Sequence, residues 1–306
     1  MCRPDKWLAV ALLAAVAAVA VAVDAPVRLF VANYADDTVR VFTADGAGEV
    51  AYSAADGLRG PYGAAALAFG PGGQLVVGNF DSGEVVRLPG GVALETVSAL
   101  FDTPDALGFD EDGALWVASR YTHTLLRLSD TDEWSVVDGS PALGQPLALS
   151  IAGASVFVAN SGGELFRYDR AAPLREYIGT YGSPGNVAIA ATADGRTVYH
   201  LARGVLRRVD TATGAATVVA TLPRGVDDGL ALAPPSSGWD DLYASDYAGA
   251  IYRVNRLTGA WAVFADRDDG LAGPSGLAFS QPDACAGYLT CDANCDGTID
   301  TADIDA

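Results

Sequence analysis

The sequence predicts an all-β protein, a six-bladed β-propeller built from four-stranded antiparallel blades, and three observations support this fold. A short apolar segment recurs six times along the 306-residue chain. Its copies start at residues 29, 75, 115, 156, 198 and 242, at spacings of 46, 40, 41, 42 and 44 residues. Asp-Gly and Gly-Gly pairs, which favour tight turns between antiparallel strands, separate the segments. Such a period, built from short strands, is typical of propeller blades.

Each repeat contains four expected strands, ordered from the centre of the ring outward. The innermost strand is rich in small residues, which suit a crowded centre, and its copies lie at 66–69, 106–109, 147–149, 187–189, 230–232 and 277–279. The second strand is the recurring segment itself. The third strand is expected at 38–42, 84–88, 124–128, 164–168, 205–209 and 250–254. A more variable fourth strand follows, for example at 215–220 and 261–264.

The order of the strand types predicts how the ring closes. The first repeat begins at its second strand, 29–33, whereas the last innermost strand, 277–279, has no second strand after it. We therefore expect 277–279 to lie inside the first blade, so that the two ends of the domain pair and leave no open radial gap in the ring. The propeller domain is expected to span residues 27–280.

Two kinds of polar residue recur with the repeat. An arginine occupies one position of the third strand in five blades, at Arg87, Arg127, Arg167, Arg208 and Arg253. Repetition favours a structural role, in which the arginine stem packs or the guanidinium bonds a neighbouring blade. The second strand ends in an Asn or Asp that is expected to bond local backbone, at Asn33, Asn79, Asn160 and Asp246.

Residues 1–22 have the features of a secretory signal peptide. Arg3 and Lys6 precede an Ala/Val/Leu-rich run at 7–23, and Ala20-Val21-Ala22 gives the small-x-small pattern of a cleavage site. The run is slightly shorter than the ~20 apolar residues that a membrane-spanning helix needs, which favours cleavage over anchoring. We expect a secreted bacterial protein, extracellular or at the cell surface, with no membrane span after cleavage.

The charge balance excludes one class of partner. The formal net charge is −19. Cleavage after Ala22 would remove Arg3, Lys6 and Asp5, which together carry +1, and leave −20. A surface of this sign repels phosphate backbones and anionic lipids, so nucleic acid is not an expected partner.

Candidate ligand-binding residues lie in the loops that lead into the innermost strands. These loops are expected to converge at one end of the ring axis, and proline recurs in them, which indicates rigid turns. The candidates are the side chains that break the repeat: Tyr62, Asp105, Asn186, Asp227 and Asp228. Their oxygen atoms would also suit a hard cation such as calcium.

The repeats resemble the NHL and YVTN-type propeller superfamily, which includes streptogramin lyase-like and gluconolactonase-like proteins. The resemblance is carried by Leu-Phe-Val-Ala-Asn-Tyr at 29–34 and by the strand entry Pro-Ser-Gly-Leu-Ala-Phe at 274–279. It implies the fold for most of the chain and no single activity, because the fold hosts unrelated functions. A gluconolactonase-like metal site would need a first-blade glutamate, which the sequence does not identify. A lyase would need a histidine, and His123 and His200 lie outside the mouth loops.

Residues 292–303 carry the one specific metal-binding motif. Gly297 stands at the sixth position, where such a loop turns sharply, and Ile299 stands at the eighth. The expected calcium ligands follow the EF-hand spacing: Asp292, Asn294, Asp296, Thr298 through its backbone carbonyl, Asp300 and Asp303. Calcium is therefore the expected cofactor of this tail, which a linker at 281–291 joins to the propeller.

The tail is similar to one repeat of a type I dockerin, because Asp rather than Glu ends the loop. A dockerin has two such loops, each followed by a helix, so the tail at 292–306 corresponds to a truncated dockerin. A cohesin-like partner is expected only if the dockerin is complete. Secretion permits a disulfide among Cys285, Cys291 and Cys295, and the sequence does not choose between the three pairings.

These features lead to two main classes of function. The first is a secreted, non-enzymatic module whose propeller binds a carbohydrate, peptide or protein and whose tail mediates extracellular association. The second is a metal-dependent lactonase-like or lyase-like enzyme with its site at the axial mouth. A third is an accessory protein of polysaccharide degradation, attached through the tail. The missing glutamate and the absence of histidine from the mouth loops favour the first class.

Overall fold

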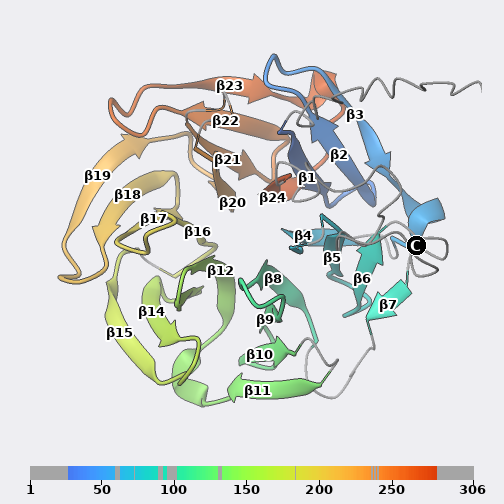
Figure 1. The fold of residues 1–306 in the computed structure, drawn as a ribbon. Helices are drawn as coiled ribbons and strands as arrows, with labels where there is room; N and C mark the ends of the chain where they lie inside the picture. Colours follow the sequence, from blue (N-terminus) through green and yellow to red (C-terminus); the bar gives the residue numbers. More distant parts are fainter. Residues whose placement is uncertain are drawn as a thin grey trace, which may run out of the picture.

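The computed structural model describes residues 27–280, apart from 59–62, 72, 89–91, 95–101, 130–132, 183, 236, 238 and 240, and gives only the backbone at 92–94. The expected signal peptide, the linker and the calcium loop lie outside the described residues. The described strands form six four-stranded antiparallel sheets, called blades A to F, arranged around a central axis (Figure 1). No described helix is long and apolar enough to cross a membrane.

Blades A to C contain the first half of the ring, and their strands are given from the axis outward. Blade A consists of β24 (Pro274–Phe279), β1 (Leu29–Asn33), β2 (Thr38–Phe42) and β3 (Gly48–Tyr52). Blade B consists of β4 (Ala64–Phe69), β5 (Leu75–Asn79), β6 (Val85–Leu88) and β7 (Val92–Leu94). Blade C consists of β8 (Pro104–Phe109), β9 (Leu115–Ser119), β10 (Thr124–Leu128) and β11 (Trp134–Asp138).

Blades D to F complete the ring. Blade D consists of β12 (Pro146–Ala152), β13 (Ser155–Asn160), β14 (Glu164–Asp169) and β15 (Arg175–Thr180). Blade E consists of β16 (Ala188–Ala191), β17 (Thr197–Ala202), β18 (Val205–Asp210) and β19 (Ala216–Thr221). Blade F consists of β20 (Val226–Leu232), β21 (Leu242–Asp246), β22 (Ala250–Val254) and β23 (Trp261–Ala265). Three short 3-10 helices lie between blades: η1 (Ala54–Asp56), η2 (Pro141–Leu143) and η3 (Arg267–Asp269).

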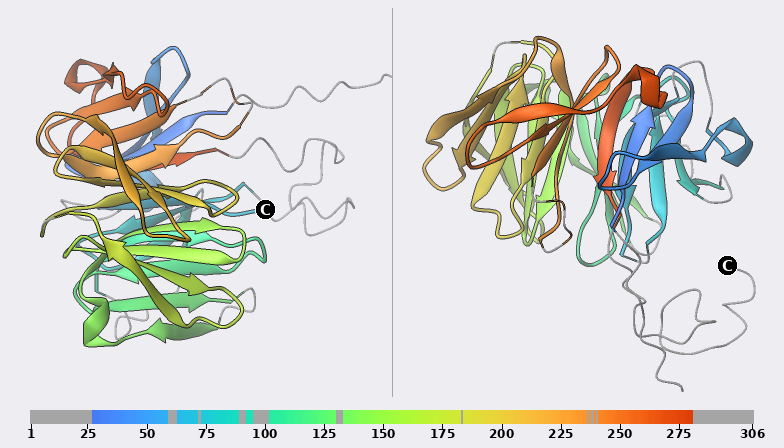
Figure 2. Two further views of the ribbon diagram at one scale, coloured as in Figure 1. Left: turned by 90° about the vertical axis from the view of Figure 1, so that its left-hand side faces the viewer. Right: turned by 90° about the horizontal axis from the view of Figure 1, so that it is seen from above.

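The ring closes in blade A, as the order of strand types predicted. Strand β24 pairs with β1 in antiparallel register, with Leu29 opposite Phe279 and Val31 opposite Leu277. Beyond the last pair, the N–H of Ser280 donates to the carbonyl of Arg28 at 2.9 Å. Seen from the side, the blades form a disc-like ring (Figure 2). The two ends of the propeller are therefore joined within one sheet.

The core lies between neighbouring blades. Each of the six clusters of buried apolar side chains found in the described residues combines residues of two adjacent blades. Between blades F and A, Trp239 packs edge-on against Tyr243 and Phe279, with ring centres 5.2 and 5.1 Å apart. Burial of these large rings stabilises the junction at which the two ends of the chain meet.

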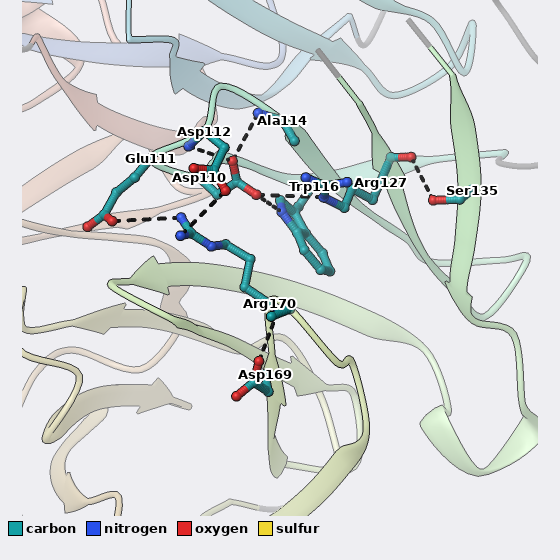
Figure 3. A network of polar contacts seen from close by, with 10 residues as sticks. Asp110, Glu111, Asp112, Ala114, Trp116, Arg127, Ser135, Asp169 and Arg170 are labelled. Carbon is teal, nitrogen blue, oxygen red and sulfur yellow. Dashed lines mark hydrogen bonds and ion pairs between the residues drawn. The ribbon is translucent and has the colours of Figure 1, made fainter. Parts of the chain in front are cut away.

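Asp110 organises the turn between β8 and β9 in blade C (Figure 3). Its buried carboxylate accepts hydrogen bonds from the N–H groups of Asp112 and Ala114, at 3.1 and 2.9 Å, and from the indole nitrogen of Trp116 at 2.9 Å. Arg127 lies over the Trp116 ring, and its Nε is 3.7 Å from Asp110. The recurring arginine of this blade therefore has a structural role within its own blade.

A different arginine links this turn to the next blade. Arg170, which follows β14 of blade D, forms ion pairs with Glu111 at 3.8 Å and Asp112 at 3.5 Å (Figure 3). Of the side chains that end the second strands, Asn160 and Asp246 bond local backbone as predicted, whereas Asn33 bonds a loop distant in sequence and the buried Asn79 side chain has no hydrogen-bond partner among the described residues. Asn33 accepts a hydrogen bond from the N–H of Ala272 at 2.7 Å, and Asn160 accepts from two N–H groups in the turn that follows it.

Candidate functional site

A cavity of about 210 Å³, called the mouth cavity below, lies at the end of the axis where the innermost strands begin. All six blades contribute to its wall. The lining residues are Tyr34, Ala65, Phe80, Asp105, Arg120, Leu147, Asn186, Val187, Asp227, Asp228, Tyr247 and Ser275. Because equivalent positions carry different side chains, the cavity departs from the symmetry of the ring.

β-Bulges place several of these side chains. In β8, Pro104 and Ala106 pair with consecutive residues of β9, so Asp105 is an extra residue that lies outside the ladder. In β20, Val226 and Gly229 pair with consecutive residues of β21, so the bulge contains both Asp227 and Asp228. A bulge re-aims a side chain that regular pairing would direct along the sheet face. Blade F therefore supplies two carboxyl groups where blade C supplies one.

Asp105 faces Arg120, the residue that follows β9. The Nε of Arg120 lies 3.8 Å from Oδ2 of Asp105, too far for a good hydrogen bond. Among the described residues, neither of these two buried atoms has a hydrogen-bond partner. Burial raises the pKa of Asp105 to about 7, although the charge of Arg120 opposes this shift. The pair therefore leaves unused hydrogen-bonding capacity inside the cavity.

Asp227 and Asp228 form the acidic side of the mouth cavity. Asp228 accepts hydrogen bonds from Nδ2 of Asn186 at 2.9 Å and from the N–H of Tyr247 at 2.8 Å. Burial, followed by the charge of Asp227, raises the pKa of Asp228 to about 7. Asp227 accepts from the N–H of Arg203 at 3.1 Å, and burial raises its pKa as well. Close carboxyl groups disfavour each other's ionisation, which explains part of the Asp228 shift.

Three aromatic rings form another side of the cavity. The ring of Tyr34 lies edge-on to Phe80, with centres 5.4 Å apart, and to Tyr247, with centres 5.7 Å apart. These rings come from blades A, B and F, which are neighbours across the closure of the ring. Tyr247 is 52% exposed, so it offers ring surface to a ligand. Aromatic faces in such positions bind apolar or cationic groups.

A narrower cavity of about 80 Å³ continues from the mouth cavity along the axis. Asp105 and Asp228 line both cavities. The wall of the narrower cavity includes one aliphatic side chain from each blade, and together these residues are called the aliphatic collar: Leu67, Leu107, Leu149, Ile189, Leu230 and Leu277. The collar forms the apolar floor of the site, and the two carboxyl groups lie just above it.

The structure brings Asp105, Asn186, Asp227 and Asp228 together in the mouth cavity. It places Asp105, Asp227 and Asp228 in bulged strands rather than in the loops that the sequence suggested. Tyr62 and the expected calcium ligands of the tail lie outside the described residues. Within the described part of the chain, no group of three or more His, Cys, Asp or Glu side chains is placed to hold a metal ion.

The sequence candidates left out eight of the twelve lining residues, and four of these eight carry an aromatic ring or a charge. Tyr34, Phe80, Arg120 and Tyr247 each follow directly after a second strand of the repeat. The signal that could have found them is the variation at this one position, because the strand before it is similar in every blade. Neither histidine lines the cavity.

Comparisons with known proteins support the fold. No protein-family model matches the sequence, and no curated protein matches it. Among solved structures, 1466 chains match. One of them belongs to a crystal structure of a nidogen/laminin complex, with a TM-score of 0.67 and 10% sequence identity, over 84% of this chain and 100% of that chain. At this identity the likeness shows the fold alone: the chain is a six-bladed β-propeller.

Proposed function

We propose that this chain is a secreted binding module of the NHL/YVTN type, and that its mouth cavity holds part of an extracellular carbohydrate, peptide or protein. One observation carries the proposal: non-repeated side chains from all six blades line a single cavity. Ligand sites combine apolar walls with a few convergent polar groups, and here three rings lie beside carboxyl and amide groups. The volume suits one side chain or one sugar unit of a larger ligand.

The proposal is tested by screening the secreted chain on glycan and peptide arrays. Tyr247→Ala removes a ring from the cavity wall, and we expect it to reduce binding of every ligand that the wild type selects by about tenfold. Tyr177→Ala on the outer strand β15 is the matched control, since Tyr177 is 57% exposed and does not line the cavity. Equal losses in both variants, or no selective binding to either array, would contradict the proposal.

For the tail, we propose that the loop at 292–303 binds calcium and mediates extracellular association, as in a dockerin. The support is the register of its oxygen-bearing residues and of Gly297. Calorimetric titration with calcium should show binding to the secreted chain and none to a chain that ends at Ser280. Binding that survives the truncation would move the metal from the tail to the propeller.

A second candidate function is an enzyme with its site at the same mouth. The observation that favours it is that Asp105 and Asp228 line the same cavity, where burial raises the pKa of both to about 7, a value suited to a general acid or base. A panel of lactones and esters tests this candidate. Turnover by the wild type that Asp228→Asn abolishes would favour the enzyme, whereas binding without turnover would favour the module.

A further inference from the structure

We infer that the mouth cavity accepts a lysine or arginine side chain of an extended peptide, with the cationic group at Asp105 and Asp228. The inference rests on the proposed binding site and narrows its ligand class. It comes from the depth at which the lining residues lie, from the balance of charge in the cavity and from the rings at its rim.

The depth of the lining residues matches a long side chain with a charged end. Asp105 and Asp228 line both the mouth cavity and the narrower cavity below it, whereas Tyr34, Phe80 and Tyr247 line only the mouth cavity. A lysine or arginine has an apolar stem that lies well along rings and a charged head that needs polar partners. An inserted side chain would place its stem between the rings and its head at the carboxyl groups.

The balance of charge in the cavity favours a cation. Three carboxyl groups line it, and Arg120 is the one arginine among its described lining residues. The guanidinium of Arg120 lies 3.8 Å from Asp105, and its Nε makes no hydrogen bond within the described structure. Arg203 compensates Asp227 only in part, because its charge opposes but does not cancel the rise in the pKa of that carboxyl group, and its guanidinium donates to the carbonyl of Pro184.

Asp228 is the carboxyl group with the greatest need of a cation. Its described hydrogen-bond donors, Asn186 and the N–H of Tyr247, are both uncharged, and no described arginine forms an ion pair with it. The carboxyl groups of Asp227 and Asp246 lie close enough to raise its pKa further. The charge of a partly buried carboxyl group without a cation is costly, which is why its pKa is raised, and a bound cation would stabilise the charged form.

Two other occupants fit the cavity less well. A neutral sugar would hydrogen-bond the carboxyl groups and leave their charge uncompensated. A free metal ion lacks a suitable set of ligands, since no described group of three acidic, His or Cys side chains is arranged to hold one. The formal net charge of −19 adds a long-range attraction for basic peptides.

The test is a calorimetric titration of the full secreted chain at physiological salt. Salt at this concentration screens the long-range attraction between the acidic surface and basic peptides. The probes are the blocked pentapeptide acetyl-Gly-Gly-Lys-Gly-Gly-amide and its norleucine analogue, which has a similar apolar stem and no charge. We expect the lysine peptide to bind at least about tenfold more tightly than the norleucine peptide. Asp228→Asn should remove most of this difference.

Asp45→Asn is the matched control, because Asp45 is an exposed aspartate in the turn after β2, outside the mouth cavity, and its loss removes the same formal charge. It should leave the affinity within about twofold. Thermal unfolding of each variant verifies that it is folded. Equal affinity for the two peptides, no binding of the lysine peptide, or an equal loss in both variants would overturn the inference. If a glycan then binds and Tyr247→Ala abolishes that binding, the proposed function stands without the cationic ligand.

Discussion

His200 is a titratable side chain that is fully buried inside the ring. It lies in β17 of blade E at 0% exposure, at a position that valine or alanine occupies in the other blades. Neither ring nitrogen has a hydrogen-bond partner among the described residues. Its nearest aromatic contact is Tyr181, edge-on at 5.7 Å between ring centres. Burial, followed by the charge of Arg207, lowers the pKa of His200 to about 4.

This depressed pKa predicts a loss of stability on acidification. As the pH falls below about 6.5, the unfolded chain binds a proton at His200, and the folded chain does not until about pH 4. The free energy of unfolding should therefore fall through this window, by about 2 kcal/mol at about pH 5. His200→Leu should lose less stability than the wild type between about pH 8 and pH 5, as measured by urea unfolding.

His123 provides the control for that measurement. It lies in the turn after β9 with φ of 59°, a conformation that asparagine tolerates. His123→Asn should keep the acid sensitivity of the wild type. If His200→Leu and the wild type lose the same stability over the same pH range, the buried imidazole is not the group responsible.

At the residue scale, the sequence predicted the acidic part of the site better than its aromatic part. Asp105, Asp227 and Asp228 could be found because they interrupt an otherwise repeated strand entry. The bulges that direct these side chains could not be found, because an extra residue in a strand leaves no mark on a short apolar pattern. Tyr34 and Phe80 were missed because an aromatic residue after an apolar strand also fits an ordinary core or surface position.

At the scale of elements, the innermost strands of neighbouring blades approach each other closely through glycine. A Cβ added at Gly229 in β20 would lie 2.0 Å from the carbonyl oxygen of Ser275 in β24. A Cβ at Gly276 in β24 would lie 2.6 Å from the carbonyl oxygen of Ala65 in β4. Hydrogen bonds reinforce these contacts, since Ser245 Oγ donates to the carbonyl of Ser275 at 2.7 Å.

Gly229→Ala should therefore separate blades F and A. The clash is with backbone, which cannot rotate away as a side chain can, so we expect a loss of about 3 kcal/mol in the free energy of unfolding. Gly139→Ala is the control, because its Cβ would make only ordinary contact, 3.4 Å from Val136. Urea unfolding of both variants measures the difference. Similar stability of the two variants would mean that the inner strands can move apart at little cost.

At the scale of the whole molecule, the ring depends on one strand from the far end of the chain. Without β24, blade A would lose its innermost strand, and the Leu29 edge of β1 would be unpaired. The Trp239 and Tyr243 rings would also lose their contact with Phe279. Closure therefore couples the first blade to the last.

A chain that ends at Gly273 should fail to form a stable ring. We expect it to lack a cooperative thermal transition, whereas a chain that ends at Ser280 should unfold as cooperatively as the full chain. Circular dichroism during heating distinguishes these outcomes. A shared transition temperature for the two truncated chains would show that β24 is dispensable.

The sequence alone predicted most of this global architecture. The regular spacing of the second strands gave six blades, and the unmatched strand at 277–279 predicted the closure, because both follow from the number and order of strands. The widths of the mouth cavity and of the narrower cavity below it could not be predicted. They depend on how far the side chains of the aliphatic collar, such as Leu107 and Ile189, extend toward the axis. Such distances come from packing, which no linear pattern encodes.

The central claim, that the mouth cavity is the ligand site, is tested most directly by hydrogen–deuterium exchange with and without the tightest ligand from the arrays. We predict slower exchange at 103–106, 184–188, 224–230 and 244–249, four segments that contain residues lining the cavity. The outer strands β3, β15, β19 and β23 should exchange at unchanged rates. Slower exchange confined to the outer strands, or to residues 281–306, would place the ligand elsewhere and contradict the claim that the mouth cavity is the ligand site.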